Sequence, residues 1–319
     1  MTSQLSLFVL DVEPAAATAT RRSHVSGYPS AVSGTACLPT SRGMGECPGK
    51  FQVCVLGSGS GGNSTAVRLG NRVLLIDMGL GPRTMQQRLQ QAAVGLDRVE
   101  AVCLTHLDQD HFRPSCVKMI LQRGIRLYLH QWHRIDLMRI AGARALIDAA
   151  LVHTFADEAF EPVPGLRACG VQLQHDRHGT IGYRFDSPAG ALGYATDLGH
   201  VPHALIEHLA GVEILCLESN YDELMTIHCP RPSWVNRRNM SDSGHLSNEQ
   251  AFDAVRAIAA VSARPNPQHI LLMHRSQQCN HPRKVRCVFE KDSILCHRIH
   301  LTEQRHRTRW FVARRFPSE

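Results

Sequence analysis

The segment THLDQDH at residues 105–111 concentrates side chains that bind metal ions. Its candidate ligands are His106, Asp108, Asp110 and His111. Neutral imidazole and carboxylate groups are ligands of divalent cations. Positions 106, 108 and 110 alternate along the chain and 111 follows directly, so a short loop leaving a strand could direct all four side chains at one point. The segment therefore predicts a metal site, with a solvated polar loop as the alternative.

Further metal-binding residue types follow strand-like apolar segments elsewhere in the chain. They are His175 after VQLQ, Asp197 after GYAT and His274 after ILLM, and His245 lies in SGHLSN. A single histidine at the end of a strand usually has a structural role. Several such residues in the same chain as an HxDxDH loop are better explained by one site on which they converge.

The elements that would position these residues are short strands separated by helices. Aliphatic and β-branched runs predict strands at 51–56, 64–69, 72–77, 99–105, 126–130, 170–175, 180–185, 191–197, 212–219 and 269–274. Helical patterns fall near 82–93, 113–123, 131–141, 143–151, 201–210 and 248–261. Strands in both halves of the chain, with helices between them, predict an α/β fold of two sheets between helix layers.

A glycine-rich segment near the first strand resembles a nucleotide-binding motif. GSGSGG at 57–62 matches the pattern GxGxxG, and Asp77 follows at a suitable distance. That motif must open a helix whose N-terminus faces a pyrophosphate. Here it is followed by NSTAVRLGNRVLLID, a β-branched segment broken by Gly-Asn, which predicts a hairpin. We therefore expect a tight loop beside the active site and no nucleotide cofactor.

Three parts of the chain differ in composition. Residues 1–48 are rich in Ala, Thr, Ser, Gly and Pro, which predicts a disordered N-terminal extension, with Met44 as an alternative start. Residues 49–300 form the expected folded domain, and 301–319 a basic C-terminal tail. From 281 to 319, ten Lys or Arg stand against four Asp or Glu. A basic end favours polyanions, nucleic acid first, although a solvated surface explains the charge equally well.

Composition also bears on the location of the protein. No apolar run reaches the ~20 residues of a membrane helix. The early run LSLFVL lacks the basic start of a secretory signal. The 11 cysteines are scattered, odd in number and without a CxxC pair, which favours buried thiols in a reducing compartment. We expect a cytoplasmic protein without membrane contact.

Seven segments, in order and spacing, resemble those of a known family. They are GSGSGGN, THLDQDH, HDRHGTIGYRF, TDLGH, ESNYD, SDSGHLSN and MHRSQQCN, within residues 51–285. They look like metallo-β-lactamase-fold metallo-hydrolases, and among these the YycJ/WalJ-like branch of proposed bacterial exonucleases. The resemblance implies an αββα four-layer sandwich as the hydrolase domain at 49–300, with two metals at the open edge between the sheets.

The same resemblance implies ligands for each metal. The first metal would be held by His106, Asp108 and His175, the second by Asp110, His111 and His274, with Asp197 bridging them. His178 is the rival of His175, and the HDxxG register favours His175 without excluding the other. Two metals roughly 3.5–4 Å apart can activate a water and neutralise the charge that develops on a phosphate.

His245 has a different expected role. GHLSNEQAFDAV resembles the GHxT-and-helix segment of ribonuclease Z, whose histidine serves the phosphodiester. His245 precedes a predicted helix with Ser247 or Asn248 as its N-cap, and a histidine there could donate a proton to the leaving oxygen or to a phosphate oxygen. We expect His245 and Asp110 to be the catalytic residues, with a capping or surface role as the alternative for His245.

Two further pairs complete the expected site. Arg237 and Arg238 lie upstream of His245, and their forked guanidinium donors match phosphate geometry, which predicts substrate binding. Glu218 and Asn220 of ESNYD are expected, from the resemblance, to orient ligand imidazoles.

The predicted activity is that of a metal-dependent phosphodiesterase, an exonuclease on DNA or RNA that uses a dinuclear site and metal-activated water. One alternative is a small-molecule hydrolase of the same fold that cleaves a cyclic phosphodiester or thioester. Another is a non-catalytic nucleic-acid-binding protein whose metal site has decayed at Asp108. The basic tail and the arginine pair favour the first. Nucleic acid is the expected partner, and the oligomeric state stays open.

Asp108 distinguishes this sequence from the common THxHxDH pattern, which has histidine at that position. An additional carboxylate adds one negative charge and makes the site richer in oxygen ligands. Such sites prefer manganese or magnesium over zinc. A similar HxDxDH variant occurs in the ComEC-type branch of the fold. We therefore expect two divalent cations, manganese or zinc with magnesium as a further option, and activity at mildly alkaline pH.

Overall fold

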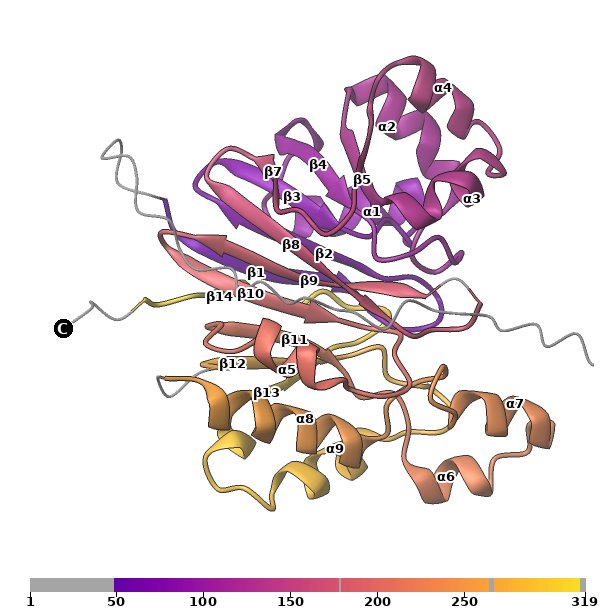
Figure 1. Ribbon diagram of the computed structural model, residues 1–319, viewed down its shortest axis with the longest axis vertical. Helices are drawn as coiled ribbons and strands as arrows, with labels where there is room; N and C mark the ends of the chain where they lie inside the picture. The colour runs from indigo at the N-terminus through magenta and orange to yellow at the C-terminus, as the bar shows by residue number, and fades with distance from the viewer. Residues whose placement is uncertain (1–48, 178, 264–266, 316–319) are drawn as a thin grey trace, which may run out of the picture. The chain divides into compact units, whose positions relative to one another are not determined.

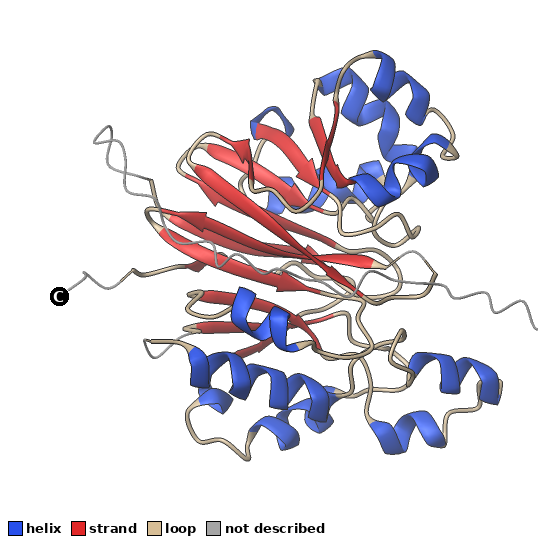
Figure 2. Cartoon of the chain, in the orientation of Figure 1, coloured by secondary structure: helices blue, strands red, loops and turns tan. Residues whose placement is uncertain are grey.

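A computed structural model describes residues 49–177, 179–263 and 267–315. The expected N-terminal extension and His178 lie outside the described residues. Two seven-stranded sheets stack face to face, and helices cover their outer faces (Figures 1 and 2).

The first sheet has the strand order β14-β1-β2-β3-β4-β5-β6. Its strands are β1 Phe51–Gly57, β2 Ser64–Leu69, β3 Arg72–Ile76, β4 Val99–Cys103, β5 Arg126–His130, β6 Val152–Phe155 and β14 Phe311–Val312. From β14 to β3 the neighbours are antiparallel, and from β3 to β6 they are parallel. The glycine-rich segment joins β1 to β2 in an antiparallel hairpin, which confirms the prediction that no helix follows it.

The second sheet has the order β13-β12-β11-β10-β9-β8-β7. Its strands are β7 Phe160–Val163, β8 Leu166–Leu173, β9 Thr180–Ser187, β10 Gly190–Ala195, β11 Ile214–Glu218, β12 His269–Met273 and β13 Ile299–Leu301. Strands β10 to β13 are parallel to one another, whereas β7 to β10 form an antiparallel meander.

Helices form the two outer layers (Figure 2). The helices are α1 Pro82–Gln91, α2 Val117–Arg123, α3 Arg134–Met138, α4 Ala143–Asp148, α5 His203–His208, α6 Glu223–Ile227, α7 Ser233–Asn239, α8 Asn248–Val261 and α9 Pro282–Phe289. Figure 1 shows α1 to α4 against the first sheet and α5, α8 and α9 against the second, with α6 and α7 beyond its end. Ser247 caps α8 in a reciprocal capping box with Gln250, which stabilises the turn that follows His245.

Side-chain alternation along the strands builds three apolar layers. In β3, Leu74 and Ile76 point into the core between the sheets, while Val73 and Leu75 pack against the helices outside. Strands with both faces buried read as continuous apolar runs, because neither face meets water. The four-layer αββα arrangement predicted from the sequence is therefore confirmed.

The parallel strands of both sheets end at the same edge of the sandwich. Asp77 directly follows β3, whereas His106 comes shortly after β4 and Asp197 shortly after β10. His274 directly follows β12. Loops at the carboxyl ends of parallel strands meet at one edge of a sheet, and this edge brings the polar residues together.

Part of the predicted C-terminal tail belongs to the sandwich. Leu301 ends β13, and β14 pairs with β1 through Gln52↔Val312 and Val53↔Phe311. Phe311 is 3% exposed and joins the core between the sheets. The net charge of the tail hid the short apolar run between its arginines. The sequence analysis also missed β6, β7, β13, α6, α7 and α9, whereas the strands and helices that it did predict are present.

Nine cysteines lie in the described part of the chain, and six of them are buried. Among the helices described, none is both long enough and apolar enough to cross a membrane.

Candidate functional site

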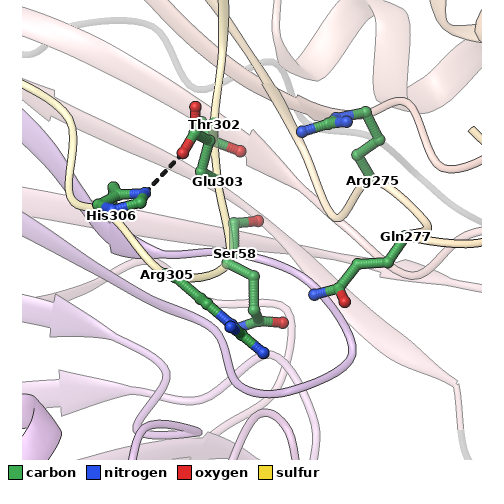
Figure 3. Close-up of a pocket in the computed structure, with 8 residues that line it drawn as sticks. Ser58, Arg275, Gln277, Thr302, Glu303, Arg305 and His306 are labelled. Atoms are coloured by element: carbon green, nitrogen blue, oxygen red, sulfur yellow. Dashed lines mark hydrogen bonds and ion pairs between the residues drawn. The ribbon is translucent and has the colours of Figure 1, made fainter. Parts of the chain in front are cut away.

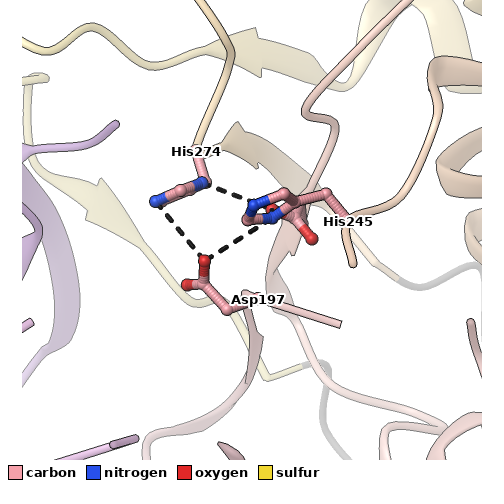
Figure 4. Close-up of side chains that lie close together, drawn as sticks. Asp197, His245 and His274 are labelled. Atoms are coloured by element: carbon pink, nitrogen blue, oxygen red, sulfur yellow. Dashed lines mark hydrogen bonds and ion pairs between the residues drawn. The ribbon is translucent and has the colours of Figure 1, made fainter. Parts of the chain in front are cut away.

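The carboxylate of Asp197 lies at the centre of the site and is 2% exposed. Its Oδ2 atom is 2.9 Å from His111 Nε2. Its Oδ1 atom faces His274 Nε2 at 3.5 Å, His245 Nδ1 at 3.6 Å and His175 Nε2 at 3.9 Å. Figure 4 shows the rings of His245 and His274 turned toward this carboxylate. Residues that are far apart in the sequence thus meet around one buried charge.

Four of the imidazoles are held through Nδ1, which leaves Nε2 for the centre of the site. The Nδ1 contacts are Asp77 Oδ2 for His111 (2.7 Å), Gly244 O for His175 (3.1 Å), Thr105 Oγ1 for His106 (2.9 Å) and Asn220 Nδ2 for His274 (3.1 Å). Metal-binding histidines are typically oriented in this way by a partner on the second ring nitrogen. The arrangement therefore suits a metal site, in which each Nε2 atom would face the cation.

Asp77 is a buried carboxylate that the sequence analysis did not assign to the site. Besides His111, it accepts hydrogen bonds from Thr105 N at 2.8 Å and from Thr105 Oγ1 at 3.0 Å. It therefore fixes both the ring of His111 and the start of the metal-site loop. The signal was its place at the end of a predicted strand, the same signal that identified Asp197.

Glu218 and Asn220 contact two of the imidazoles. Glu218 Oε1 is 2.8 Å from His245 Nδ1 and 3.3 Å from His274 Nδ1. The Asn220 amide donates to His274 O at 2.7 Å. These contacts suit the orienting role expected for both residues.

Among the candidate ligand groups of the described residues, two neighbouring ones match the ligand sets expected from the sequence, and a further group joins Glu218 and His245 to Asp197 and His274. The two matching groups are His106, His175 and Asp197, and Asp110, His111 and His274, each with its atoms within 4.8 Å of one another. Within the part of the chain that the structure describes, His106 Nε2 and Asp197 Oδ2 are buried without a hydrogen-bond partner, although Asp197 Oδ2 lies close to His111. A buried polar atom without a partner is costly, and a cation would satisfy both atoms. The donor set therefore fits two divalent metals.

The two aspartates of the HxDxDH loop differ in their surroundings. Asp110 Oδ2 is 3.1 Å from His274 Nε2 and 3.8 Å from His111 Nε2, and the side chain is 23% exposed. Asp108 is 58% exposed, with Oδ2 3.7 Å from His106 Nε2. Its carboxylate also lies within a group formed with His175 and Asp176. Asp108 thus stands at the open side of the site, within reach of it.

Electrostatics couple the protonation of the histidines to Asp197. Burial raises the pKa of the Asp197 carboxyl, but His274 and His111 outweigh this and hold the pKa well below its usual value. Conversely, burial lowers the pKa of His111 and His274, but Asp197 and its neighbouring carboxylates raise both pKa values well above the usual one. Because a metal must displace these protons, metal affinity should fall as the pH is lowered.

Backbone conformation is unusual at the same residues. Asp77, Asp176, Asp197 and His274 have φ values of 62°, 40°, 59° and 52°. These are left-handed conformations, which cost free energy for residues other than glycine and are retained where a site requires them. Asp77, Asp197 and His274 are buried one or two residues past the end of a strand, whereas Asp176 is exposed.

The glycine-rich β1–β2 loop lies beside the site, as predicted. Asn63 Nδ2 is 2.9 Å from His111 Nε2 and 3.2 Å from the carbonyl oxygen of Asp110. Ser58 Oγ accepts the backbone N–H of His274 at 2.8 Å. The loop therefore supports the site through hydrogen bonds.

The expected substrate-binding arginines lie on α7. Arg238 pairs with Asp176, the neighbour of His175, with Nε 2.9 Å from Oδ1. Arg237 is exposed and donates to Ser233 Oγ at 3.2 Å. Trp234, on the turn before them, is 63% exposed. Helix α7 (Ser233–Asn239), called the α7 arm below, therefore carries cationic and aromatic groups beside the candidate metal-binding residues.

Comparison with known proteins identifies the family. A model of the β-lactamase superfamily domain matches residues 72–274. The chain belongs to this family. It is 28% identical over 233 residues to an exodeoxyribonuclease YycJ of Bacillus anthracis, which covers 71% of this chain and 83% of that protein. It is 25% identical to an exodeoxyribonuclease WalJ of Streptococcus pneumoniae, over 72% of this chain and 83% of that protein.

Solved structures show the same fold. The metallo-β-lactamase-fold protein YhfI of Bacillus subtilis superposes with a TM-score of 0.58 at 15% identity, over 82% of this chain and 99% of that one. A diphosphatase of the PhnP family gives a TM-score of 0.55 at 18% identity, over 84% and 99%. The protein thus has the metallo-β-lactamase fold.

The role of Asp77 can be tested by Asp77→Asn. Loss of the charge opposite His111 Nδ1 should weaken zinc binding about 10–100-fold, because partners that orient ligand histidines contribute on this scale. Zinc affinity is measured by competition with a chelator, and thermal unfolding in EDTA reports any separate damage to the fold. Asp97→Asn, at a side chain 69% exposed, is the matched control. Equal zinc affinity in both variants would contradict the role.

Proposed function

We propose that this hydrolase is a metal-dependent phosphodiesterase that degrades DNA from its ends. The observation that carries the proposal is the convergence of two groups of ligand atoms on Asp197, beside an arm that bears Arg237 and Arg238. The names of the bacterial relatives support DNA as the substrate.

The ligands proposed for the first cation are His106, Asp108 and His175, those for the second are Asp110, His111 and His274, and Asp197 lies between them. When bound, two such cations supply Lewis acidity that activates water and neutralises negative charge on a phosphate. The chain contributes the orientation of these side chains through the Nδ1 contacts. Asp110 is 23% exposed, so it can also contact the reacting group.

His245 is the proposed proton donor. Its side chain is 16% exposed, more than those of His175 and His274, so it can reach a bound substrate. Burial lowers its pKa, but the Glu218 carboxylate outweighs this, so the net pKa is raised above the usual value. A raised pKa favours the protonated form of His245, which can give a proton to a leaving oxygen.

The α7 arm is the proposed contact for the DNA strand. Arg237 and Arg238 supply charge for phosphates, and Trp234 supplies an exposed aromatic face on which a base can stack. The pairing of Arg238 with Asp176 holds the arm beside His175. Such groups suit a polynucleotide better than a compact ester, because they extend away from the metal-binding residues.

The proposed activity can be tested with linear duplex DNA, covalently closed circular DNA and RNA of the same sequence, with manganese or zinc added. The metal-loaded protein should release nucleotides from linear DNA and leave the closed circle intact. Asp197→Asn should reduce turnover to background while the circular dichroism spectrum is retained, and Asp97→Asn should match the wild type. Degradation of RNA alone, or cutting of the closed circle, would refute the proposal. Full activity of Asp197→Asn would refute the role of that carboxylate.

His245→Ala separates proton donation from metal binding. Turnover should fall by roughly 10²–10⁴, the scale of general acid–base groups, with unchanged metal content. The loss should be largest for substrates with a poorly acidic leaving group, because these need the proton most. Wild-type activity should also decline as the pH rises through the raised pKa of His245. A variant that loses metal would show that His245 is a ligand.

Asp108→His tests how the negative charge of Asp108, at the open side of the candidate metal site, affects the choice of metal and the pH optimum. Replacing the carboxylate should raise zinc affinity and shift the pH optimum downward, because one fewer negative charge makes the attacking water more acidic. The wild type should prefer manganese and work best at mildly alkaline pH. The pH profile of turnover and the zinc dissociation constant are measured for both proteins. If the variant gains activity that the wild type lacks with every metal, Asp108 marks a decayed site.

A further inference from the structure

A pocket of about 260 Å³ lies next to the candidate metal centre, on the side of His274. Three segments line it: Ser58 of the β1–β2 loop, Arg275 and Gln277 after β12, and residues 302–306 after β13. Figure 3 shows Arg275 and Gln277 on one side and the 302–306 segment on the other. None of these residues is a proposed metal ligand, proton donor or contact of the α7 arm.

The wall of the pocket is continuous with the metal centre. Ser58 Oγ accepts the N–H of His274 at 2.8 Å, and Ser58 N donates to the carbonyl oxygen of Glu303 at 3.1 Å. Arg275 is the residue that follows His274. A group bound in the pocket therefore lies directly beside a group held at the metal-binding residues.

The glycine-rich loop allows this wall to form. Gln304 Oε1 accepts the N–H of Gly61 at 2.6 Å, and its amide donates to Gly62 O at 2.9 Å. A Cβ atom at Gly59, where φ is +139°, would lie 2.7 Å from Gln304 Oε1. The glycines of the segment that resembles a nucleotide motif thus allow the 302–306 segment to pack closely against the β1–β2 loop.

Arg275 has an unmet requirement for a partner. Its Nε atom is buried, and no hydrogen bond to it is formed within the described residues. The nearby carboxylate of Glu303 is already engaged with His306 Nδ1 at 2.7 Å. A buried N–H without an acceptor destabilises a protein unless a ligand or water satisfies it, and for a guanidinium the best acceptor is an anion.

The chemistry of the lining selects a phosphate group. Arg275 and Arg305 bring two permanent positive charges, and Gln277 adds an exposed amide. The pocket is smaller than the roughly 300–1,000 Å³ of sites that enclose a drug-sized ligand, so it suits a phosphate or part of a nucleotide. We propose that it binds a backbone phosphate of the nucleic-acid strand adjacent to the phosphodiester being cleaved, an inference that rests on the proposed function.

The test uses metal-loaded protein with Arg275→Gln, Arg305→Gln and the double variant, and Arg123→Gln on the exposed side of α2 as the control for lost charge. Each pocket variant should raise KM for short duplex DNA about tenfold, the loss of one charge-assisted hydrogen bond. The change in KM for bis(4-nitrophenyl) phosphate should be at least about tenfold smaller than the change in KM for DNA. Binding of a phosphorothioate duplex, followed by anisotropy, should lose about one unit of salt slope per arginine. Arg123→Gln should leave KM unchanged for both substrates.

Other outcomes overturn the inference. If DNA is degraded and both pocket variants keep the wild-type KM and salt slope, the pocket does not bind the strand, and the proposed function stands. If inhibition by inorganic phosphate weakens while DNA affinity is unchanged, the pocket holds free phosphate instead. Arg305→Gln cannot act by unfolding, because the side chain is exposed. A wild type that neither degrades nor binds DNA refutes the proposed function and the pocket assignment together.

Discussion

A carboxylate removed from water must be compensated by positive charge or donors, and Asp197 meets this requirement with imidazoles on several sides. Each imidazole needs its own partner to stay oriented, which is why Asp77, Glu218 and Asn220 are drawn into the same edge. These partners come from the ends of strands in both sheets. The site thus requires the two sheets to be held in a fixed position relative to each other. The apolar core between the sheets holds them in that position.

Much of this edge was readable in the sequence because it follows simple physical rules. Parallel strands buried on both faces give continuous apolar runs, and a polar residue directly after such a run lies at the edge. His274 and Asp197 were found in this way, and the order of the motifs led to the fold, which the family match confirms. The short helices α6 and α7 were not predicted.

Other features depend on three-dimensional contacts that no local pattern encodes. Asp77 looked like the acidic residue of a nucleotide motif, and only the fold shows that it faces His111. The pairing of Arg238 with Asp176 joins residues 62 positions apart. The integration of β14 was hidden because two residues of strand pairing are too short to stand out among arginines. The sequence therefore predicts the strands that carry the candidate ligands better than it predicts the residues that orient those ligands.

The return of the chain to β1 has a consequence for how the molecule is made. Val55 N donates to Thr308 Oγ1, 253 positions later, and β14 then covers the outer edge of β1. During synthesis, one edge of β1 stays unpaired until these residues have left the ribosome. Unpaired strand edges can pair with strands of other chains. Contacts of such sequence separation also slow folding. Protection of the nascent chain therefore matters more here than for a protein assembled from local contacts.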